Sequence, residues 1–549
     1  MLATIVALCL LITTAAGAPQ AASAREDIVP QSSTAATYVP ISGAGSSWSA
    51  NAIDQWRRNV QQFGMRVNYA STGSSDGRNQ FRSGTVDFAS SEIPYGLTDG
   101  GVVDTPPTRK FAYMPIVAGG TSIMYNLTIG NQRITNLRLS GETITRIFTG
   151  VITSWDHPAI KADNPGITLP ARRIVPVVRS DGSGSTAQLT AWMASEHRSL
   201  WDAYCAKANR PTPCGQTSNY PVLSGSGFVG QPGSQGVAGY VSQRANVGTI
   251  TYVEYSYALK AGYPVAKVLN RAGYYVEPTA SNVAVSLLSA RINNDPSSSA
   301  YLTQILTGVY RSTDPRVYPL SSYSYLIVPT AAEGNFTAAK GETLGDFAYY
   351  FLCEGQRQAE ALGYSPLPIN LVKAGLEQVR RIPGVEVQSI NISKCNNPTF
   401  SADGTNTLAK NAPQPAACDR RGDTQCATGT GGAADNPTPT DNSGGSDSGS
   451  DAGEGVDTGV DAGGGMGGGG GLGGGGGPGS VGSGGGTAIC DIDTGACQTV
   501  ASVPVEIESA AEGWTRDNVL MMVALLVLLA TVIIPPALAR MIRGSRSSS

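Results

Sequence analysis

The chain has 549 residues, and its 38 basic and 41 acidic side chains give a formal net charge of −3. A balance this close to neutral argues against nucleic acid as a partner, because such partners select strongly basic surfaces. The length allows two or three domains, although a long part of the chain has too few apolar residues to pack.

Residues 1–24 are predicted to be a secretory signal peptide. An apolar run from Leu2 to Ile12 is followed by small residues that end in Ala22-Ser23-Ala24, which is typical of a signal peptide and its cleavage site. The run is too short to cross a bilayer, so an N-terminal membrane anchor is the less favoured alternative. We therefore expect the chain to be exported.

Eight cysteines remain once Cys9 is removed with the signal peptide. Disulfides are the expected state of cysteines in an exported chain. Proximity in the sequence predicts four pairs, which are Cys205 with Cys214, Cys418 with Cys426, Cys490 with Cys497, and Cys353 with Cys395. Metal binding is not expected, because no C-x-x-C pair occurs and His157 and His197 are the only histidines.

From about Ser42 to Asn396, helical and strand patterns alternate. Four apolar residues at helical spacing predict a first helix, and these are Ile53, Trp56, Val60 and Phe63. Residues 66–70 then alternate as a strand, residues 79–82 resemble a helix, and residues 85–89 form a short strand. This alternation predicts an α/β fold with parallel sheets, in which ligands bind at the carboxyl ends of the strands.

Four segments in this region share glycines, serines and charged residues. They are Gly43–Trp48, Gly73–Gly77, Asp87–Glu92 and Arg179–Thr186. The last follows an apolar run, residues 174–178, and precedes a segment with Leu189, Trp192 and Met193 at helical spacing. Free N–H groups at a helix start, serine hydroxyls and an arginine suit a tetrahedral anion. An ordinary capped helix after a loop is the alternative for the last segment.

In this order the four segments resemble the phosphate-binding proteins of bacterial ABC importers, the PstS-type family. The resemblance extends from Ile41 to about Ile392 and includes six further segments, which are Val67–Tyr69, Thr85–Phe88, Ile152–Asp156, Gly248–Ala258 with its core Tyr252–Tyr255, Tyr318–Leu320 and Tyr325–Pro329. It implies a two-lobed α/β fold, the type II periplasmic-binding-protein fold, that closes on its ligand. Lobe 1 would comprise residues 41–118 and 321–393, and lobe 2 would comprise residues 119–320.

The resemblance also implies a phosphate-binding shell. Its members would be Ser47, Trp48, Ser74, Glu92, Arg179, Asp181, Ser183, Gly184 and Ser185. Arg179 would be the cationic clamp, oriented by Asp181, while Trp48 and Gly184 would offer their backbone N–H groups. Ser47 and Ser185 stand where the family has threonine, and Glu92 stands where it usually has aspartate.

Glu92 needs a physical explanation, because it is an anion placed among groups that bind an anion. Phosphate near neutral pH keeps a proton that a carboxylate can accept, whereas sulfate has none. Leaving a buried carboxylate unpaired costs about 1–3 kcal/mol or more, and sites that read a hydroxyl reject analogues without it by roughly 10⁴–10⁵. Glu92 is therefore expected to select phosphate. Alternatively, it shrinks the pocket, weakens the selectivity or turns away toward a cation.

The composition changes after Cys426. Residues 394–427 read as a cysteine-containing extension, and residues 428–486, rich in Gly, Ser and Asp, read as a flexible linker. A second cysteine loop with a juxtamembrane segment follows at 487–516. Residues 517–539 are apolar enough to cross a bilayer, and the arginines in 540–549 predict a cytoplasmic tail. A cleaved GPI-type tail is the alternative.

The leading hypothesis is a non-enzymatic receptor that captures inorganic phosphate outside the membrane for an ABC permease and its ATPase. The alternative is a membrane-tethered surface interaction protein, or a phosphate sensor, that keeps the fold without feeding a transporter. A hydrolase is less favoured, because neither histidine lies near a serine motif in the sequence. Residues 224–230 contain G-x-G-x-x-G, but no dinucleotide-binding unit surrounds them, so no nucleotide cofactor is expected.

Overall fold

The structure of the protein is a computed structural model. It describes residues 38–99, 101–298, 300–388, 395, 397–401 and 403–440, and the backbone of 488–490 and 497–499. The chain divides into two units, Met1–Ser450 and Asp451–Ser549. The described part of the second unit is the antiparallel pair β18 (Ala488–Cys490) and β19 (Cys497–Thr499). All other described elements belong to the first unit.

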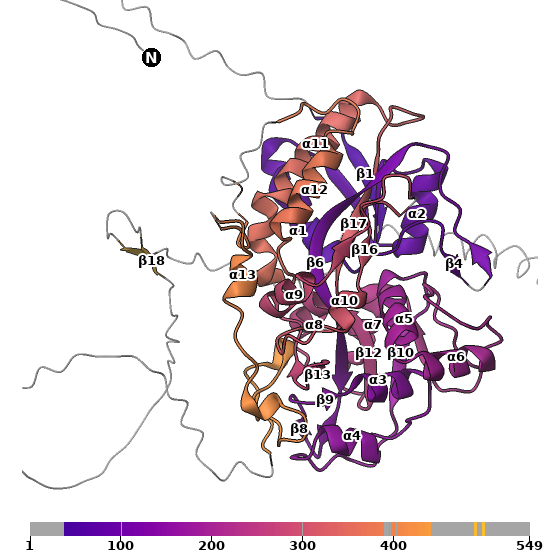
Figure 1. Ribbon diagram of the computed structural model, residues 1–549, viewed down its shortest axis with the longest axis vertical. Helices are drawn as coiled ribbons and strands as arrows, with labels where there is room; N and C mark the ends of the chain where they lie inside the picture. The colour runs from indigo at the N-terminus through magenta and orange to yellow at the C-terminus, as the bar shows by residue number, and fades with distance from the viewer. Residues whose placement is uncertain are drawn as a thin grey trace, which may run out of the picture. The chain divides into compact units, whose positions relative to one another are not determined.

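Strands and helices alternate along most of the first unit (Figure 1), as the sequence pattern predicted. The strands are β1 (Ile41–Gly45), β2 (Val67–Ala70), β3 (Phe88–Ser91), β4 (Thr98–Asp99), β5 (Val102–Val103), β6 (Phe111–Asn126), β7 (Thr128–Ile129), β8 (Gln132–Arg133), β9 (Arg138–Leu139), β10 (Val175–Arg179), β11 (Val229–Gln231), β12 (Thr249–Glu254), β13 (Val265–Leu269), β14 (Tyr275–Val276), β15 (Arg291–Ile292), β16 (Gln304–Ile305) and β17 (Ser321–Pro329). The helices are α1 (Ala50–Val60), α2 (Ser74–Ser83), α3 (Gly141–Phe148), α4 (Pro158–Asp163), α5 (Gly184–Glu196), α6 (Arg198–Lys207), α7 (Gly233–Val241), α8 (Tyr255–Ala261), α9 (Ala280–Leu287), α10 (Thr307–Tyr310), α11 (Ala338–Leu352), α12 (Ile369–Val379) and α13 (Thr407–Lys410).

One large sheet runs through the first unit in the order β11-β10-β12-β6-β17-β3-β1-β2. Its outer strands are parallel, since β1 pairs in parallel with β2 and β3, and β10 pairs in parallel with β11 and β12. The central strands β6 and β17 are antiparallel to their neighbours. The predicted two-lobed α/β fold is confirmed. The expectation of parallel sheets was wrong for the centre, because β6 and β17 connect the lobes rather than belonging to β-α-β units.

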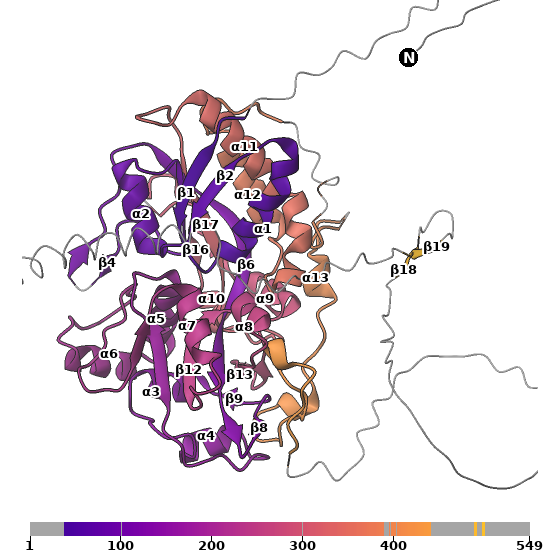
Figure 2. The ribbon, with the colours of Figure 1, turned by 180° about the vertical axis from the view of Figure 1, so that it is seen from behind.

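Strand β6 joins the two lobes (Figures 1 and 2). Its residues 111–120 pair with β17, whereas residues 121–126 pair with β12. The change of partner lies beside Gly119 and Gly120, where an added Cβ would come within 2.8 Å of Trp48 Cη2 and 2.4 Å of Pro278 Cβ, respectively. Glycine therefore permits the close packing at this point. We name the half with β1, β2, β3 and β17 lobe 1, and the half with β10, β11 and β12 lobe 2.

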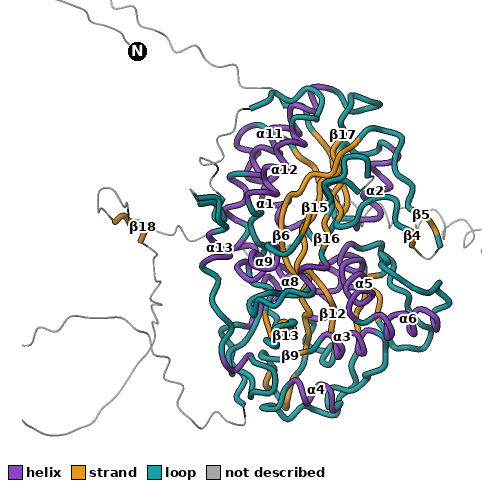
Figure 3. Tube along the Cα trace, in the orientation of Figure 1, coloured by secondary structure: helices purple, strands orange, loops and turns teal. Residues whose placement is uncertain are grey.

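Helices cover both faces of the strands in each lobe (Figure 3). In lobe 2, Tyr252 belongs to the core cluster that contains Trp192 of α5, whereas its neighbour Val253 belongs to the cluster that contains Val237 of α7. Successive side chains of a strand point to opposite faces, so the sheet is packed on both sides. In lobe 1, Trp56 of α1 stacks on Phe351 of α11, with ring centroids 5.2 Å apart.

Two local predictions need correction. Phe63 does not continue the buried face of the first helix and is 55% exposed, because α1 ends at Val60 and a 3-10 turn leads into Gly64 with φ 84°. The strand predicted at 85–89 begins later, at Phe88. The backbone N–H of Thr85 donates to Gln80 O at 3.0 Å and so closes the end of α2 instead.

Three of the four predicted disulfides are confirmed. They are Cys205–Cys214, Cys353–Cys395 and Cys418–Cys426, with Cα separations of 6.1, 4.8 and 5.1 Å. Cys490 and Cys497 lie opposite each other in the β18–β19 pair, but their side chains are outside the described residues, so this pair stays a prediction.

The C-terminal extension begins on lobe 1, where Thr399 Oγ1 donates to Leu367 O at 3.0 Å, then packs against lobe 2, and is longer than predicted. The buried Arg138 donates to Cys418 O at 2.7 Å and to Asp423 O at 2.8 Å, and Lys267 forms an ion pair with Asp419 at 2.8 Å. Residues 428–440, which the composition placed in the flexible linker, also belong to the fold. Thr430 is fully buried between the backbones of lobe 2. Hydrogen bonds hold this segment on lobe 2. The prediction of a linker considered only the lack of apolar residues, so it did not detect these bonds.

The predicted signal peptide (1–24), the rest of the linker (441–486) and the predicted membrane helix (517–539) with its tail (540–549) lie outside the described residues. Within the part of the chain that the structure describes, no helix is both long and apolar enough to cross a membrane.

Candidate functional site

The predicted glycine- and serine-rich turns lie at strand ends and lead into helices. Residues 43–48 form the end of β1 and the turn toward α1, and residue 73 precedes α2. Ser183 caps α5, with its hydroxyl accepting from Thr186 N at 3.3 Å. Because β1 and β2 are parallel and neighbouring, their turns meet at one edge of lobe 1. The turn after β10 occupies the equivalent place in lobe 2.

These turns contact one another between the lobes. Gly184 N of lobe 2 donates to Ser74 Oγ of lobe 1 at 3.1 Å. Ser234 N at the start of α7 donates to Ser47 Oγ at 2.9 Å, and the two hydroxyl oxygens are also 2.9 Å apart. All four residues are buried. The structure thus brings together backbone N–H groups and hydroxyls from segments that are far apart in the sequence.

Arg179 provides the positive charge at this junction. It is the last residue of β10 and 3% exposed. Its Nε donates to Asp181 Oδ1 at 2.7 Å and its Nη2 donates to Oδ2, while Nη1 lies 3.5 Å from Ser234 Oγ. Burial opposes ionisation of Asp181, but the hydrogen bond and charge of Arg179 outweigh it and lower the pKa of the carboxyl. Asp181 therefore orients the guanidinium and leaves Nη1 directed at the junction.

Glu92 provides a negative charge in the same place. It follows β3 and is 1% exposed. Its Oε1 accepts from Ser46 Oγ at 2.5 Å and from Ser324 Oγ at 2.8 Å, and its Oε2 accepts from Ser74 Oγ at 2.7 Å. An added Cβ at Gly184 would lie 1.8 Å from Oε2, so only glycine permits this approach of lobe 1 to the start of α5. Serine hydroxyls, rather than a cation, solvate this carboxylate.

The remaining predicted residues also lie at the junction. Ser185 is buried, and its hydroxyl has no hydrogen-bond partner among the described residues. Trp48 packs edge-on against Tyr364, with ring centroids 5.8 Å apart. Its indole ring therefore bounds the junction by packing. Its backbone N–H, the predicted donor, bonds to Ser46 Oγ at 3.0 Å. Ser183 N donates to Ser218 O at 2.9 Å, and its hydroxyl proton stays available because the oxygen acts as acceptor in the helix cap.

Three serines of the site were missed by the sequence analysis. Ser46 stands inside a predicted motif but was not assigned a role. Ser234 follows the strand β11 and the residues Pro232-Gly233, which is the same strand–turn–helix pattern that identified the other segments. Ser324 lies in the middle of β17 and has no local signal, because only strand pairing brings it beside Glu92.

The two histidines and the G-x-G-x-x-G segment, which were considered for metal binding, hydrolysis or nucleotide binding, lie in ordinary structural settings. The ring of His157 accepts from Ala159 N at 3.1 Å and caps α4, and His197 packs edge-on against Trp192. Burial lowers the pKa of His197. Residues 224–228 form a loop and residues 229–230 begin β11, whereas a dinucleotide-binding loop follows a strand and opens a helix.

Comparison with known proteins identifies the family. Residues 16–354 match the family described as the PBP superfamily domain. The phosphate-binding protein PstS of Xylella fastidiosa is 33% identical over 347 residues, covering 63% of this chain and 86% of the relative. That of Pasteurella multocida is 31% identical over 338 residues, covering 61% and 88%. The solved phosphate-binding protein of Stenotrophomonas maltophilia covers 67% of this chain and 99% of its own, at 19% identity and a TM-score of 0.46. The chain therefore belongs to the PBP superfamily and, within it, to the PstS-type phosphate-binding proteins.

Proposed function

We propose that this protein is an extracytoplasmic solute-binding protein that captures inorganic phosphate between its two lobes for an ABC importer. The observation that supports this most directly is the junction itself. A buried arginine, a buried carboxylate and several serine hydroxyls meet there from both lobes, and Ser185 Oγ is buried without a partner among the described residues. The family relationship supports phosphate as the ligand, and these contacts support the junction as the place where we propose that it binds.

The chain's own groups divide into donors and one acceptor. Arg179 supplies a guanidinium that is held in place by Asp181, and charge-assisted bonds of this kind are stronger than neutral ones. The starts of α2 and α5 direct N–H groups to the same place, where the helix dipoles favour an anion. Ser47, Ser183 and Ser185 add hydroxyl donors, whereas the Ser74 hydroxyl donates to Glu92. Capture of phosphate requires no covalent bond to be made or broken, so the role is that of a receptor and not of an enzyme.

Glu92 is the acceptor and gives the selectivity. All three bonds to its carboxylate come from hydroxyl donors, so a bound anion must bring its own proton to contact the remaining lone pairs. Hydrogen phosphate brings such a proton, whereas sulfate would place two unscreened negative charges in contact. We therefore expect phosphate to be strongly preferred to sulfate.

A calorimetric titration tests this proposal. The full chain, purified in a mild detergent because of its predicted membrane helix, is titrated with sodium phosphate and separately with sodium sulfate at pH 7.5. We expect saturable binding of one phosphate per chain. The affinity for sulfate should be lower than the affinity for phosphate by roughly 10³-fold or more. Tight binding of sulfate, or no response to phosphate, would contradict the proposal.

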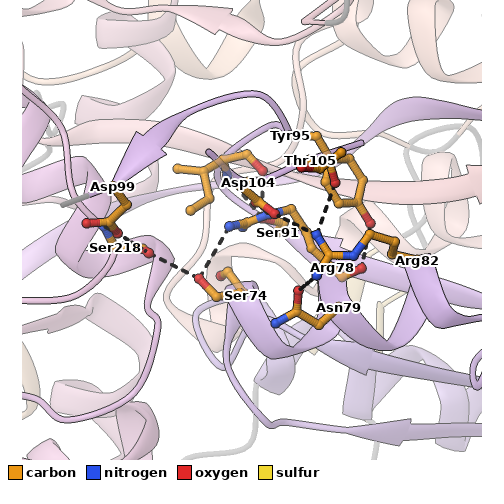
Figure 4. Close-up of polar contacts among 12 residues, drawn as sticks. Ser74, Arg78, Asn79, Arg82, Ser91, Tyr95, Asp99, Asp104, Thr105 and Ser218 are labelled. Carbon is orange, nitrogen blue, oxygen red and sulfur yellow. Dashed lines mark hydrogen bonds and ion pairs between the residues drawn. The ribbon is translucent and has the colours of Figure 1, made fainter. Parts of the chain in front are cut away.

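Closure over the anion is supported by a second contact between the lobes (Figure 4). Asp99 at the end of β4 in lobe 1 accepts from Ser218 N at 2.8 Å, from Ser218 Oγ at 2.7 Å and from Asn219 Nδ2 at 3.0 Å, all in lobe 2. Arg210 of lobe 2 lies 3.3 Å from the same carboxylate. These bonds hold the pKa of Asp99 below its usual value although burial acts in the opposite direction.

Asp99→Asn should therefore speed the release of phosphate. The substitution removes the charge and turns one acceptor into a donor that faces other donors. We expect dissociation about tenfold faster with association little changed, since truncating a charged partner acts on the dissociation rate. Stopped-flow chase measurements give both rates. Asp104→Asn is the matched control, because Asp104 bonds to Arg78 and Arg82, both in lobe 1 (Figure 4). Equal release from both variants would show that Asp99 does not hold the lobes together.

The same bonds predict an acid response. Because the pKa of Asp99 is lowered, its contribution is complete above the usual value of 3.8 and is lost as the pH falls below that value. Release from the parent protein should then accelerate, and release from Asp99→Asn should change less over the same pH range.

We place the protein outside the plasma membrane, held by residues 517–539 with the arginine-rich tail 540–549 in the cytoplasm. The support is the apolar run 519–538 and the arginines that follow it. Alkaline carbonate should leave the full chain in the membrane fraction and release a chain that ends at residue 516. Copurification with an ABC permease would support delivery to an importer, whereas phosphate binding without permease or uptake would favour the sensor alternative.

A further inference from the structure

We infer that Ser324 and Ser46 are positioning residues that fix which oxygen of Glu92 reads the ligand. This inference rests on the proposed phosphate site and adds a specificity determinant to it. Both hydroxyls bond to Oε1, at 2.8 Å from Ser324 and 2.5 Å from Ser46, whereas Oε2 has a single donor, Ser74. With Oε1 occupied, Oε2 is the oxygen that accepts the proton of hydrogen phosphate.

The direction of the hydroxyl protons follows from the groups around them. Ser46 Oγ accepts from the backbone N–H of Trp48 at 3.0 Å and more weakly from that of Ser49 at 3.4 Å. Ser74 Oγ accepts from Gly184 N at 3.1 Å. A hydroxyl whose lone pairs receive N–H groups has its single proton left to donate, and in both serines the next acceptor is Glu92. Each hydroxyl therefore accepts from backbone N–H groups at the beginning of a helix, just before α1 or at the start of α5, and donates its own proton to the carboxylate.

Ser324 is placed by an irregularity in the sheet. In the β17–β6 ladder, Ser324 lies opposite Val117 but Tyr325 lies opposite Pro115, so β6 has one extra residue at this point. Proline lacks the N–H that a regular ladder needs, and bulges of this kind re-aim side chains. Ser324 is fully buried, and its other neighbour is Ser90 Oγ at 3.3 Å. A buried hydroxyl on a neighbouring strand is a rigid support for the carboxylate.

The consequence concerns selectivity more than affinity. Without the Ser324 hydroxyl, Oε1 keeps one donor, and the carboxylate can rotate about its last bond. A rotated carboxylate would no longer hold Oε2 against the ligand, so phosphate would lose its acceptor and sulfate would meet less repulsion. The ratio of phosphate to sulfate affinity therefore depends on a strand residue that need not touch the ligand.

The test compares two serines on the same strand. Ser322 and Ser324 are both at most 1% exposed, but Ser322 Oγ has no hydrogen-bond partner among the described residues. Ser324→Ala should lower the ratio of phosphate to sulfate affinity by about tenfold or more, the usual size of a hydrogen bond to a charged group. Ser322→Ala should change this ratio less than about twofold, because it removes no bond. Both ratios come from calorimetry of the full chain in detergent.

A second pair keeps the test valid if Ser324→Ala unfolds. Ser324→Thr and Ser324→Val add the same volume, and only threonine keeps the hydroxyl. We expect threonine to retain the ratio and valine to lose it. An unchanged ratio in Ser324→Ala, or equal ratios in the threonine and valine variants, would overturn the inference even if the parent protein binds phosphate. Failure of the parent protein to bind phosphate would instead overturn the proposed function.

Discussion

Arg179→Ala is expected to abolish phosphate binding in the micromolar range. Arg179 is the one cation found among the described contacts of the site, and its removal leaves the carboxylates of Asp181 and Glu92 close to the bound anion. Loss of a buried, hydrogen-bonded charge costs about 2–5 kcal/mol, which is roughly 30-fold to several thousandfold in affinity. Calorimetry and protection from thermal unfolding by phosphate would both report this loss.

The chain offers a matched control for this variant. Arg316 also forms a two-bond pair with an aspartate two residues away, with its Nε and Nη2 at 3.0 and 2.8 Å from the oxygens of Asp314. Arg316 also donates to Ala409 O of the C-terminal extension, and among the described residues it contacts no member of the site. Arg316→Ala should lower stability without altering the affinity for phosphate. A phosphate affinity that survives in Arg179→Ala would mean that the anion does not bind at this junction.

Glu92→Gln is expected to remove the selectivity for a protonated anion. The glutamine carbonyl can keep the bonds from Ser46 and Ser324, while its NH₂ group replaces Oε2 and donates toward the ligand. Phosphate then loses its acceptor and sulfate gains a donor. Because a site that reads a hydroxyl discriminates by about 10⁴–10⁵, we expect the phosphate-to-sulfate ratio to fall by at least about 100-fold.

Glu92→Asp is the control that keeps the negative charge and changes only the length of the side chain. It keeps the acceptor but shortens the side chain by one methylene, so the bonds from Ser46 and Ser324 should lengthen. We expect weaker phosphate binding with the preference over sulfate retained. If Glu92→Gln keeps the preference of the parent protein, Glu92 does not read the proton, and selectivity must come from elsewhere in the shell.

Local sequence was sufficient to identify most of the site. The segments that start at Gly43, Gly73 and Arg179 combine glycine, serine and charge at strand ends, and the structure places each of them before a helix. Such segments are local because a helix start is built from a few consecutive residues. The resemblance to a known family then supplied the order in which these segments face one another, which composition alone does not contain.

Other features depended on residues that meet only after folding. Ser324 lies 232 positions from Glu92, and its hydroxyl reaches the carboxylate only because β17 pairs with β3. Asp99 was given no role by the sequence analysis, and its partners Ser218 and Asn219 meet it only because the lobes come together. Residues 428–440 were predicted to be linker from their composition, yet backbone and threonine hydrogen bonds fix them on lobe 2.

Sequence patterns alone therefore predicted which charged residues stand beside helix starts, together with the three disulfides that the structure describes. Which hydroxyls solvate Glu92, and how the lobes contact each other, became known from the folded chain. The difference arises because capping and turn formation depend on neighbours in the chain. Solvation of a buried charge instead depends on every group within hydrogen-bond distance, wherever that group lies in the sequence.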